Sequence, residues 1–211
     1  SLPGGRLWLF DTGQTPLFLS NARVLGLDVS TARGLTLSHG HYDHTGGLWA
    51  LMQRSGFQGP VYGHPHVTRE RFSIKNNTPV RSIGMPDNSR RALDRLVEVR
   101  GSVELDEGLT FFTDVARQPG SFEPVQGYYF DKEGTKPERI EDDAFLLVQT
   151  PRGPVVVLGC CHSGLANSLE HLREQTGIAK LHAVVGGLHL GYAPPEALRE
   201  AVEAVRRFQV E

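Results

Sequence analysis

Three histidines and one aspartate lie within six consecutive residues near the start of this 211-residue chain. They occupy residues 39–44, which read His-Gly-His-Tyr-Asp-His, and two glycines follow at positions 46 and 47. Residues 34–38 before them suit a short buried strand, and residues 48–52 after them suit a helix. Because imidazole nitrogens and carboxylate oxygens are the usual donors for zinc and related divalent ions, the segment predicts a metal site on a strand-to-helix loop.

The spacing within this cluster divides the donors into two pairs. Side chains two residues apart in an extended chain point to the same side, so His39 and His41 can bind one ion together. Asp43 and His44 are neighbours, and a turn into a helix is needed to aim both at a second ion. The pair of glycines that follows permits the tight approach that this turn requires.

Composition and charge fit a compact soluble enzyme. With 39% hydrophobic residues, the chain can bury a large core, and we expect a single domain over residues 1–211. Lys and Arg total 22 against 24 for Asp and Glu, so the chain has no general positive field to attract nucleic acid. No apolar run approaches the length of a membrane span, and we expect no membrane partner.

The only two cysteines, Cys160 and Cys161, are adjacent in the sequence. A bond between them would close a strained ring, so we expect no disulfide scaffold. Reduced cysteines in a sequence that shows no secretion signal favour a cytoplasmic setting.

Short apolar runs alternate with helical segments along the chain, which predicts a mixed α/β fold. We expect strands at residues 7–10, 34–38, 60–63, 97–99, 109–112, 144–148, 154–158 and 183–185, and helices at 17–27, 48–52, 165–175 and 195–208. The strands at 144–148 and 154–158 are expected to form a hairpin. The polar residues 73–91 are expected to form an exposed insertion or lid, and residues 117–143 a loop that borders the site.

Residues 38–47 resemble the first metal motif of the metallo-β-lactamase superfamily, whose strongest signature is HxHxDH. The resemblance implies an α/β fold of the αβ/βα sandwich type, with two mixed β-sheets and helices outside. It also implies that His39 and His41 bind one metal ion, while Asp43 and His44 bind the other.

In many relatives a further histidine and then a bridging aspartate complete the site. This chain has no histidine between His66 and His162, and Cys160 stands where the bridging aspartate is expected. His162 lies just beyond a predicted strand, where the chain reverses and exposes its side chains at the sheet edge, so we expect it to replace the missing imidazole. His189 follows the strand at 183–185, as the last ligand of the superfamily does.

Cys160 has two interpretations. Its thiolate would be an excellent zinc ligand, yet a buried cysteine is often only a small apolar residue. Without a bridging carboxylate, the two metal positions would be less tightly coupled, and we expect one or two divalent ions, with zinc the expected metal. Cys161 is expected to pack in the core, and His171 and His182 to have surface roles.

Five segments together resemble the subgroup named for dihydropterin ribofuranosylaminobenzene 5′-phosphate synthase; they are residues 9–14, 38–47, 61–65, 159–164 and 186–190. This resemblance implies a metal-dependent hydrolase or synthase that acts on a small, phosphorylated or pterin-like molecule through metal-activated water. Relatives usually have a strand or more before the Asp11 motif, so we expect that the first strand of the domain is missing.

Further residues receive roles around the predicted ions. Asp43 is expected to steer the proton of the attacking water, and Asp11 to accept a hydrogen bond from the far nitrogen of a ligand histidine. His66, Arg69 and Arg71 are candidates for substrate binding, because arginine guanidinium groups bind phosphate well.

Four alternatives are weaker on the same residues. A thioester or lactone hydrolase similar to glyoxalase II normally has the later histidine and the bridging aspartate, which are absent here. A nuclease similar to the tRNA-processing members would need a basic surplus. A metal-dependent ligand-binding or sensor protein remains the non-enzyme alternative, and oxygen-reducing di-iron relatives generally carry Glu at the position of His41.

Overall fold

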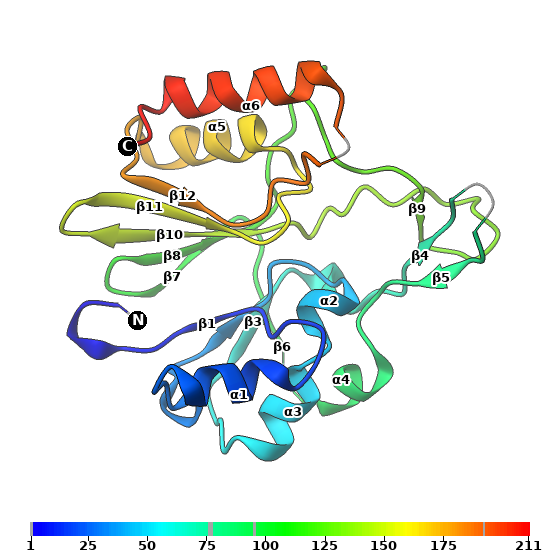
Figure 1. Ribbon diagram of the computed structural model, residues 1–211, viewed down its shortest axis with the longest axis vertical. Helices are drawn as coiled ribbons and strands as arrows, with labels where there is room; N and C mark the ends of the chain where they lie inside the picture. Colours follow the sequence, from blue (N-terminus) through cyan, green and yellow to red (C-terminus); the bar gives the residue numbers. More distant parts are fainter. Residues whose placement is uncertain (1, 76–77, 95, 192) are drawn as a thin grey trace. The chain divides into compact units, whose positions relative to one another are not determined.

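The computed structural model describes residues 2–75, 78–94, 96–191 and 193–211. The described chain forms two compact units, each with its own sheet and core (Figure 1). Unit 1 comprises Ser1–Val99 and Gly127–Glu138, and unit 2 comprises Arg100–Gln126 and Arg139–Glu211. The single domain expected over residues 1–211 stays a prediction.

Unit 1 is built on a parallel sheet of four short strands in the order β1-β2-β3-β6. Their bounds are β1 Leu9–Phe10, β2 Leu35–Thr36, β3 Val61–Gly63 and β6 Leu96–Glu98. Leu35 pairs with Leu9 on one side and with Val61 on the other, and its side chain is completely buried. Helices α1 (Leu17–Val24) and α3 (Leu48–Arg54) cover one face of this sheet (Figure 1). Parallel strands require such crossover helices, which explains the alternation seen in the sequence.

The remaining elements of unit 1 are short. They are the 3₁₀ turns η1 Pro3–Gly5, η2 Val29–Thr31 and η3 Pro65–Thr68, the helices α2 Tyr42–Thr45 and α4 Asp87–Ala92, and the strands β4 Phe72–Ser73, β5 Arg81–Ser82 and β9 Tyr128–Tyr129. The last three form a small antiparallel sheet in the order β5-β4-β9. Segment 127–138 therefore returns to unit 1 from a distant part of the sequence.

Unit 2 contains a mixed sheet in the order β12-β11-β10-β8-β7. Its strands are β7 Ser102–Asp106, β8 Leu109–Phe112, β10 Phe145–Thr150, β11 Gly153–Leu158 and β12 Ala183–Val185. The predicted hairpin is confirmed, because β10 and β11 pair antiparallel from Phe145 opposite Leu158 to Thr150 opposite Gly153. Strand β12 runs parallel to β11, so the carboxyl ends of these two strands meet at the same edge.

Two helices cover one face of the mixed sheet (Figure 1). Helix α5 spans Leu165–Thr176 and ends at Gly177, whose φ of 75° is the left-handed conformation typical of a helix terminus. Helix α6 spans Pro195–Arg207, and the proline at its first position is favourable because that residue needs no hydrogen-bond donor. No helix among the described residues is both long and apolar enough to cross a membrane.

The expected surface role of His171 is wrong, because this residue of α5 is buried in unit 2. Its ring lies edge-on to Phe112 and Phe145, and its Nδ1 atom accepts a hydrogen bond from the Ala116 N–H at 3.3 Å. Burial lowers the pKa of His171, although two nearby carboxylates, those of Glu174 and Asp114, oppose the shift.

Residues 73–91 are not simply an exposed insertion. This segment contributes β5 and the start of α4, and its Met85 side chain is buried in the core of unit 1. Its residues 76 and 77 lie outside the described residues. Two-residue strands leave too little sequence for a periodic pattern, which explains why polar composition suggested a loop.

Candidate metal centre

The carboxyl ends of three neighbouring parallel strands in unit 1 bring the sequence-predicted residues to one edge of the sheet. Asp11 directly follows β1, His39 lies three residues beyond β2, and His64 directly follows β3. Ligands of open α/β sheets bind outside the carboxyl ends of the strands. The fold of unit 1 therefore places the histidine loop (residues 38–47) where a functional site is expected.

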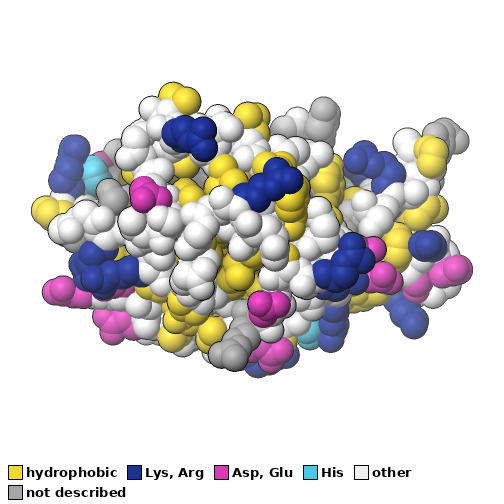
Figure 2. All heavy atoms as spheres, turned by 90° about the horizontal axis from the view of Figure 1, so that it is seen from below, with side chains coloured by type: hydrophobic (Ala, Val, Ile, Leu, Met, Phe, Trp, Pro, Cys, Tyr) yellow, Lys and Arg dark blue, Asp and Glu magenta, His cyan; other side chains and the backbone are white. Residues whose placement is uncertain are grey.

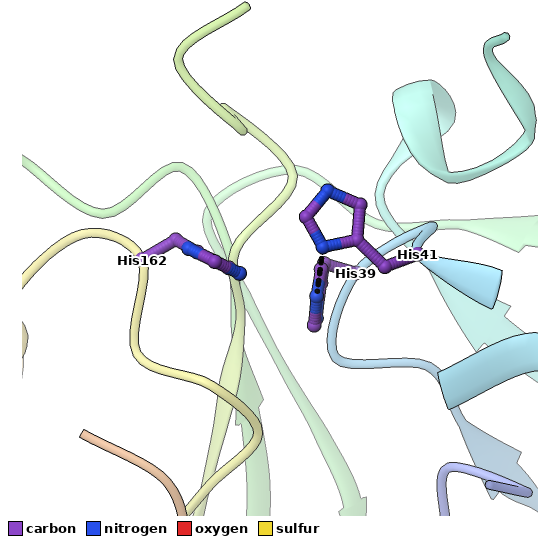
Figure 3. Close-up of side chains that lie close together, drawn as sticks. All are labelled: His39, His41 and His162. Carbon is purple, nitrogen blue, oxygen red and sulfur yellow. Dashed lines mark hydrogen bonds between the residues drawn. The ribbon is translucent and has the colours of Figure 1, made fainter. Parts of the chain in front are cut away.

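The imidazoles of His39 and His41 face each other within this loop. Both are buried, and the His39 Nε2 atom lies 3.0 Å from His41 Nδ1, as the dashed line in Figure 3 marks. Their ring centroids are 4.5 Å apart and their planes meet at 75°. His41 has an extended backbone and is followed at once by helix α2, so the change of direction predicted for the loop is present.

The carboxylate of Asp11 fixes the orientation of the His39 and His44 rings through hydrogen bonds. Its Oδ1 atom accepts the Ser38 N–H at 2.7 Å, and its Oδ2 atom accepts the Ser38 hydroxyl at 2.7 Å and lies 2.6 Å from His44 Nδ1. Since the Ser38 hydroxyl donates to Asp11, its oxygen accepts a hydrogen bond from His39 Nδ1 at 2.9 Å. Protons on both Nδ1 atoms leave the Nε2 atoms of His39 and His44 as lone-pair donors, which is the tautomer of a metal-binding histidine.

The backbone conformation of Asp11 also indicates a functional site. Asp11 has a φ of 60°, in the left-handed region that residues other than glycine seldom occupy. Such strain persists where the surrounding contacts over-determine the conformation, and it clusters at functional sites.

Asp43 and His44 form the second donor pair of the loop. One turn of α2 brings Asp43 Oδ2 to 3.9 Å from His44 Nε2. An ion about 2.0–2.2 Å from each donor can bridge atoms up to roughly 4 Å apart, so this pair can chelate one ion. The Asp43 side chain is 47% exposed, so solvent reaches its carboxylate.

Arg71, predicted to contact substrate, is instead fully buried behind the histidine loop. Its Nε atom lies 3.4 Å from Glu138 Oε2, and its Nη2 atom donates to the His66 carbonyl at 2.9 Å. A Cβ atom built on Gly40 would lie 2.2 Å from Arg71 Nη1, so this guanidinium packs against the backbone between His39 and His41. Burial argues against the predicted contact between Arg71 and a substrate phosphate.

His66 and Arg69 keep their predicted substrate roles as predictions. His66 lies in η3, its ring centroid 4.6 Å from that of the buried His64, and its backbone N–H donates to His64 Nδ1 at 3.1 Å. The His64 side chain thereby caps the start of η3. Arg69 is exposed, and its guanidinium lies over the ring of Phe130 at 5.5 Å from the centroid.

Unit 2 gathers a second set of donors. One ligand atom from each of Cys160, His162 and His189 lies within 4.8 Å of the other two. The first two residues follow β11 and the third follows the adjacent parallel strand β12. His162 is completely buried, and it extends from the loop after β11 in Figure 3. Its Nδ1 atom donates to the Pro124 carbonyl at 3.1 Å, which leaves Nε2 as the lone-pair donor.

Asp143 holds the loop that carries His162, a role that the sequence analysis missed. Its Oδ2 atom accepts the Ser163 N–H at 2.7 Å, and the side chain is buried. Burial raises the pKa of the Asp143 carboxyl, while the nearby His162 opposes the shift. The sequence shows only that Asp143 directly precedes a predicted buried strand. That position alone does not distinguish a carboxylate that holds a neighbouring loop from an ordinary loop residue.

These histidine, cysteine and aspartate side chains form donor sets that could hold a metal ion, on a fold with known relatives. The sequence profile of the Metallo-beta-lactamase superfamily matches residues 3–173, and the chain belongs to this superfamily. The predicted superfamily and its α/β fold are thereby confirmed.

Individual relatives are similar over most of the chain. The chain is 27% identical to 7,8-dihydropterin-6-methyl-4-(beta-D-ribofuranosyl)-aminobenzene-5'-phosphate synthase of Methanocaldococcus jannaschii, over 96% of this chain and 71% of the relative. The crystal structure of Tm1679, a metal-dependent hydrolase of the β-lactamase superfamily, matches with a TM-score of 0.80 and 26% identity, covering 100% of this chain and 82% of that one. Zinc-bound PqqB from Methylobacterium extorquens shares the fold with a TM-score of 0.51 at 17% identity, over 89% of this chain and 57% of that chain.

Proposed function

We propose that this protein is a metal-dependent enzyme, a hydrolase or synthase, that acts on a small, phosphorylated or pterin-like molecule. The observation that carries the proposal is the network in which Asp11 and Ser38 fix the tautomers of His39 and His44. A half-buried carboxylate on a strained backbone, which leaves the Nε2 lone pairs of His39 and His44 available, is the arrangement expected around a metal. The synthase and hydrolase names of two relatives point in the same direction.

The donors fit one or two divalent ions, with zinc the expected metal. We propose that His39 and His41 hold one ion and that Asp43 and His44 hold the other, as the superfamily motif implies, and that His162 and His189 are metal ligands as well. Neutral imidazoles together with carboxylate donors suit zinc, iron or manganese. A bound ion of this kind polarises a carbonyl or phosphoryl oxygen and lowers the pKa of a bound water.

The residues of unit 1 supply the rest of the chemistry. The exposed carboxylate of Asp43 takes up the proton of the attacking water, and Arg69 and His66 orient the substrate. The face shown in Figure 2 carries Lys and Arg as well as Asp and Glu side chains, rather than one sign of charge. This mixture supports a small-molecule substrate over a nucleic acid.

Metal analysis of purified variants tests the proposal. We expect His39→Ala and His162→Ala to lower the number of bound ions, while His182→Ala, which removes only an ion pair with Glu211, leaves it unchanged. Unchanged metal content in both ligand variants would refute the metal assignment.

The loaded wild-type protein should then be assayed against phosphoesters, pterin phosphates and thioesters. Turnover of the phosphorylated compounds supports the proposed substrate class. Turnover of thioesters alone would indicate a glyoxalase II-like hydrolase, and binding without turnover would indicate a sensor.

A further inference from the structure

We propose that Cys160, His162 and His189 bind one and the same metal ion, with the Cys160 thiolate as a direct ligand. This proposal rests on the proposed metal-dependent function and deepens it, because it assigns His162, His189 and Cys160 to a single ion. All three residues belong to unit 2, and their donor atoms lie within 4.8 Å of one another.

The topology of unit 2 brings these donors together. Strands β11 and β12 are parallel neighbours, and the Gly187 N–H beyond β12 donates to the Gly159 carbonyl beyond β11 at 2.8 Å. A Cβ atom at Gly186 would lie 2.2 Å from the Leu158 carbonyl oxygen, so only glycine permits this approach of the two chains. The result is that the rings of His162 and His189 stand with their centroids 4.6 Å apart.

Backbone strain marks both loops that carry the donors. Cys161 has a φ of 57° and His189 a φ of 51°, and neither is a glycine. Each left-handed residue of this kind costs on the order of 1–3 kcal/mol and persists where the surroundings impose it, often at ligand sites. The strain at Cys161 lies between the two proposed ligands Cys160 and His162.

The two adjacent cysteines occupy opposite environments. Cys161 is buried in the core of unit 2, with its Sγ atom 3.5 Å from Ser168 Oγ, and burial raises the pKa of its thiol. Cys160 is half-buried and faces the two imidazoles. Cys161 therefore has the packing role expected from the sequence, and Cys160 has the surroundings of a ligand.

The chemistry of this donor set is specific. Tetrahedral zinc, with bonds of about 2.3 Å to sulfur and about 2.0–2.1 Å to nitrogen, holds its donors roughly 3.5 Å apart, so side-chain movements of about 1 Å complete the site. On binding, the thiol releases its proton to solvent and the sulfur lone pair forms the metal bond. A thiolate with two imidazoles selects zinc or cobalt over magnesium or manganese.

Cobalt substitution tests the proposal with a readout that does not depend on catalysis. Cobalt bound to a thiolate shows a sulfur-to-metal charge-transfer band in the near ultraviolet, and cobalt bound only by nitrogen and oxygen does not. We expect the band in the wild-type protein and in Cys161→Ser, which serves as the matched control, and its loss in Cys160→Ser. We also expect His189→Ala to weaken cobalt binding at least tenfold.

A measurement on the wild-type protein covers the case in which Cys160→Ser fails to fold. Bound cobalt or zinc should protect Cys160 from alkylation, detected by mass spectrometry of its peptide. Bound cobalt without the charge-transfer band, or Cys160 alkylated equally with and without metal, overturns this proposal and leaves the proposed function standing. Failure of the wild-type protein to bind any metal overturns both.

Discussion

Gly40→Ala is expected to damage the histidine loop although it adds only one methyl group. The new Cβ atom would lie 2.0 Å from the Val67 carbonyl oxygen and 2.2 Å from Arg71 Nη1, whereas ordinary van der Waals contact begins at 3.4 Å. Neither neighbour can retreat easily, because Val67 is completely buried and Arg71 is buried with Glu138. We estimate a loss of roughly 3 kcal/mol in the free energy of unfolding, at the upper end of the range for overpacked interiors.

Tryptophan fluorescence during urea unfolding measures this loss in the correct part of the chain. Both tryptophans, Trp8 and Trp49, belong to unit 1, where Gly40 lies. With a denaturant slope of about 2 kcal/mol per molar urea, the midpoint should fall by roughly 1.5 M. Val24→Ala is the control within unit 1, because the Val24 side chain is 86% exposed and its truncation should leave the midpoint almost unchanged.

The same variant should bind metal more weakly, because Gly40 lies between His39 and His41 and a shift of its backbone moves both imidazoles. Competition with a chelator measures the metal affinity. A Gly40→Ala protein with the unfolding midpoint and metal affinity of the wild type would refute the close packing of Arg71 behind the loop.

Three further predictions concern ionisable side chains. Arg71→Met should destabilise unit 1 by about 3–5 kcal/mol, because it leaves the Glu138 charge unpaired. Adding Glu138→Leu should recover much of the loss in the urea midpoint. Equal midpoints for the single and double variants would contradict this prediction. Burial holds the pKa of His171 below its unfolded value of about 6.5. The contribution of His171 to the free energy of unfolding should therefore be constant above that pH and fall as the pH decreases through it. His171→Gln should flatten this pH dependence in thermal melts. Asp11→Asn should lower metal affinity about 10–100-fold in chelator competition, because the amide nitrogen would face the donors that the carboxylate now accepts from, including His44.

The parts of this protein that sequence reasoning predicted are those encoded locally. The hairpin of β10 and β11 follows from two apolar runs on either side of a turn, and the histidine loop from six adjacent residues. The superfamily resemblance adds the fold class, because residues 38–47 match a pattern whose architecture is known.

The parts that escaped prediction depend on contacts between distant segments. Arg71 has the sequence context of a surface residue, and only the return of segment 127–138 to unit 1 gives it Glu138 as a buried partner. His171 lies among charged neighbours in α5, yet the helix turns it toward Phe112 and Phe145. Neither pairing leaves a periodic signal in a single sequence, because the partner lies on a different element.

The two units hold their candidate metal-binding loops by the same kind of hydrogen bond. In unit 1 the carboxylate of Asp11 accepts the Ser38 N–H at 2.7 Å, and in unit 2 the carboxylate of Asp143 accepts the Ser163 N–H at 2.7 Å. Each carboxylate thus anchors the backbone directly beside a histidine that follows a parallel strand. The devices differ in what fixes the imidazole, since Asp11 acts through side chains whereas the Pro124 carbonyl orients His162. A substitution of Asp11 or Ser38 can therefore change the tautomer of His39 directly. A substitution of Asp143 can change the tautomer of His162 only by moving the backbone.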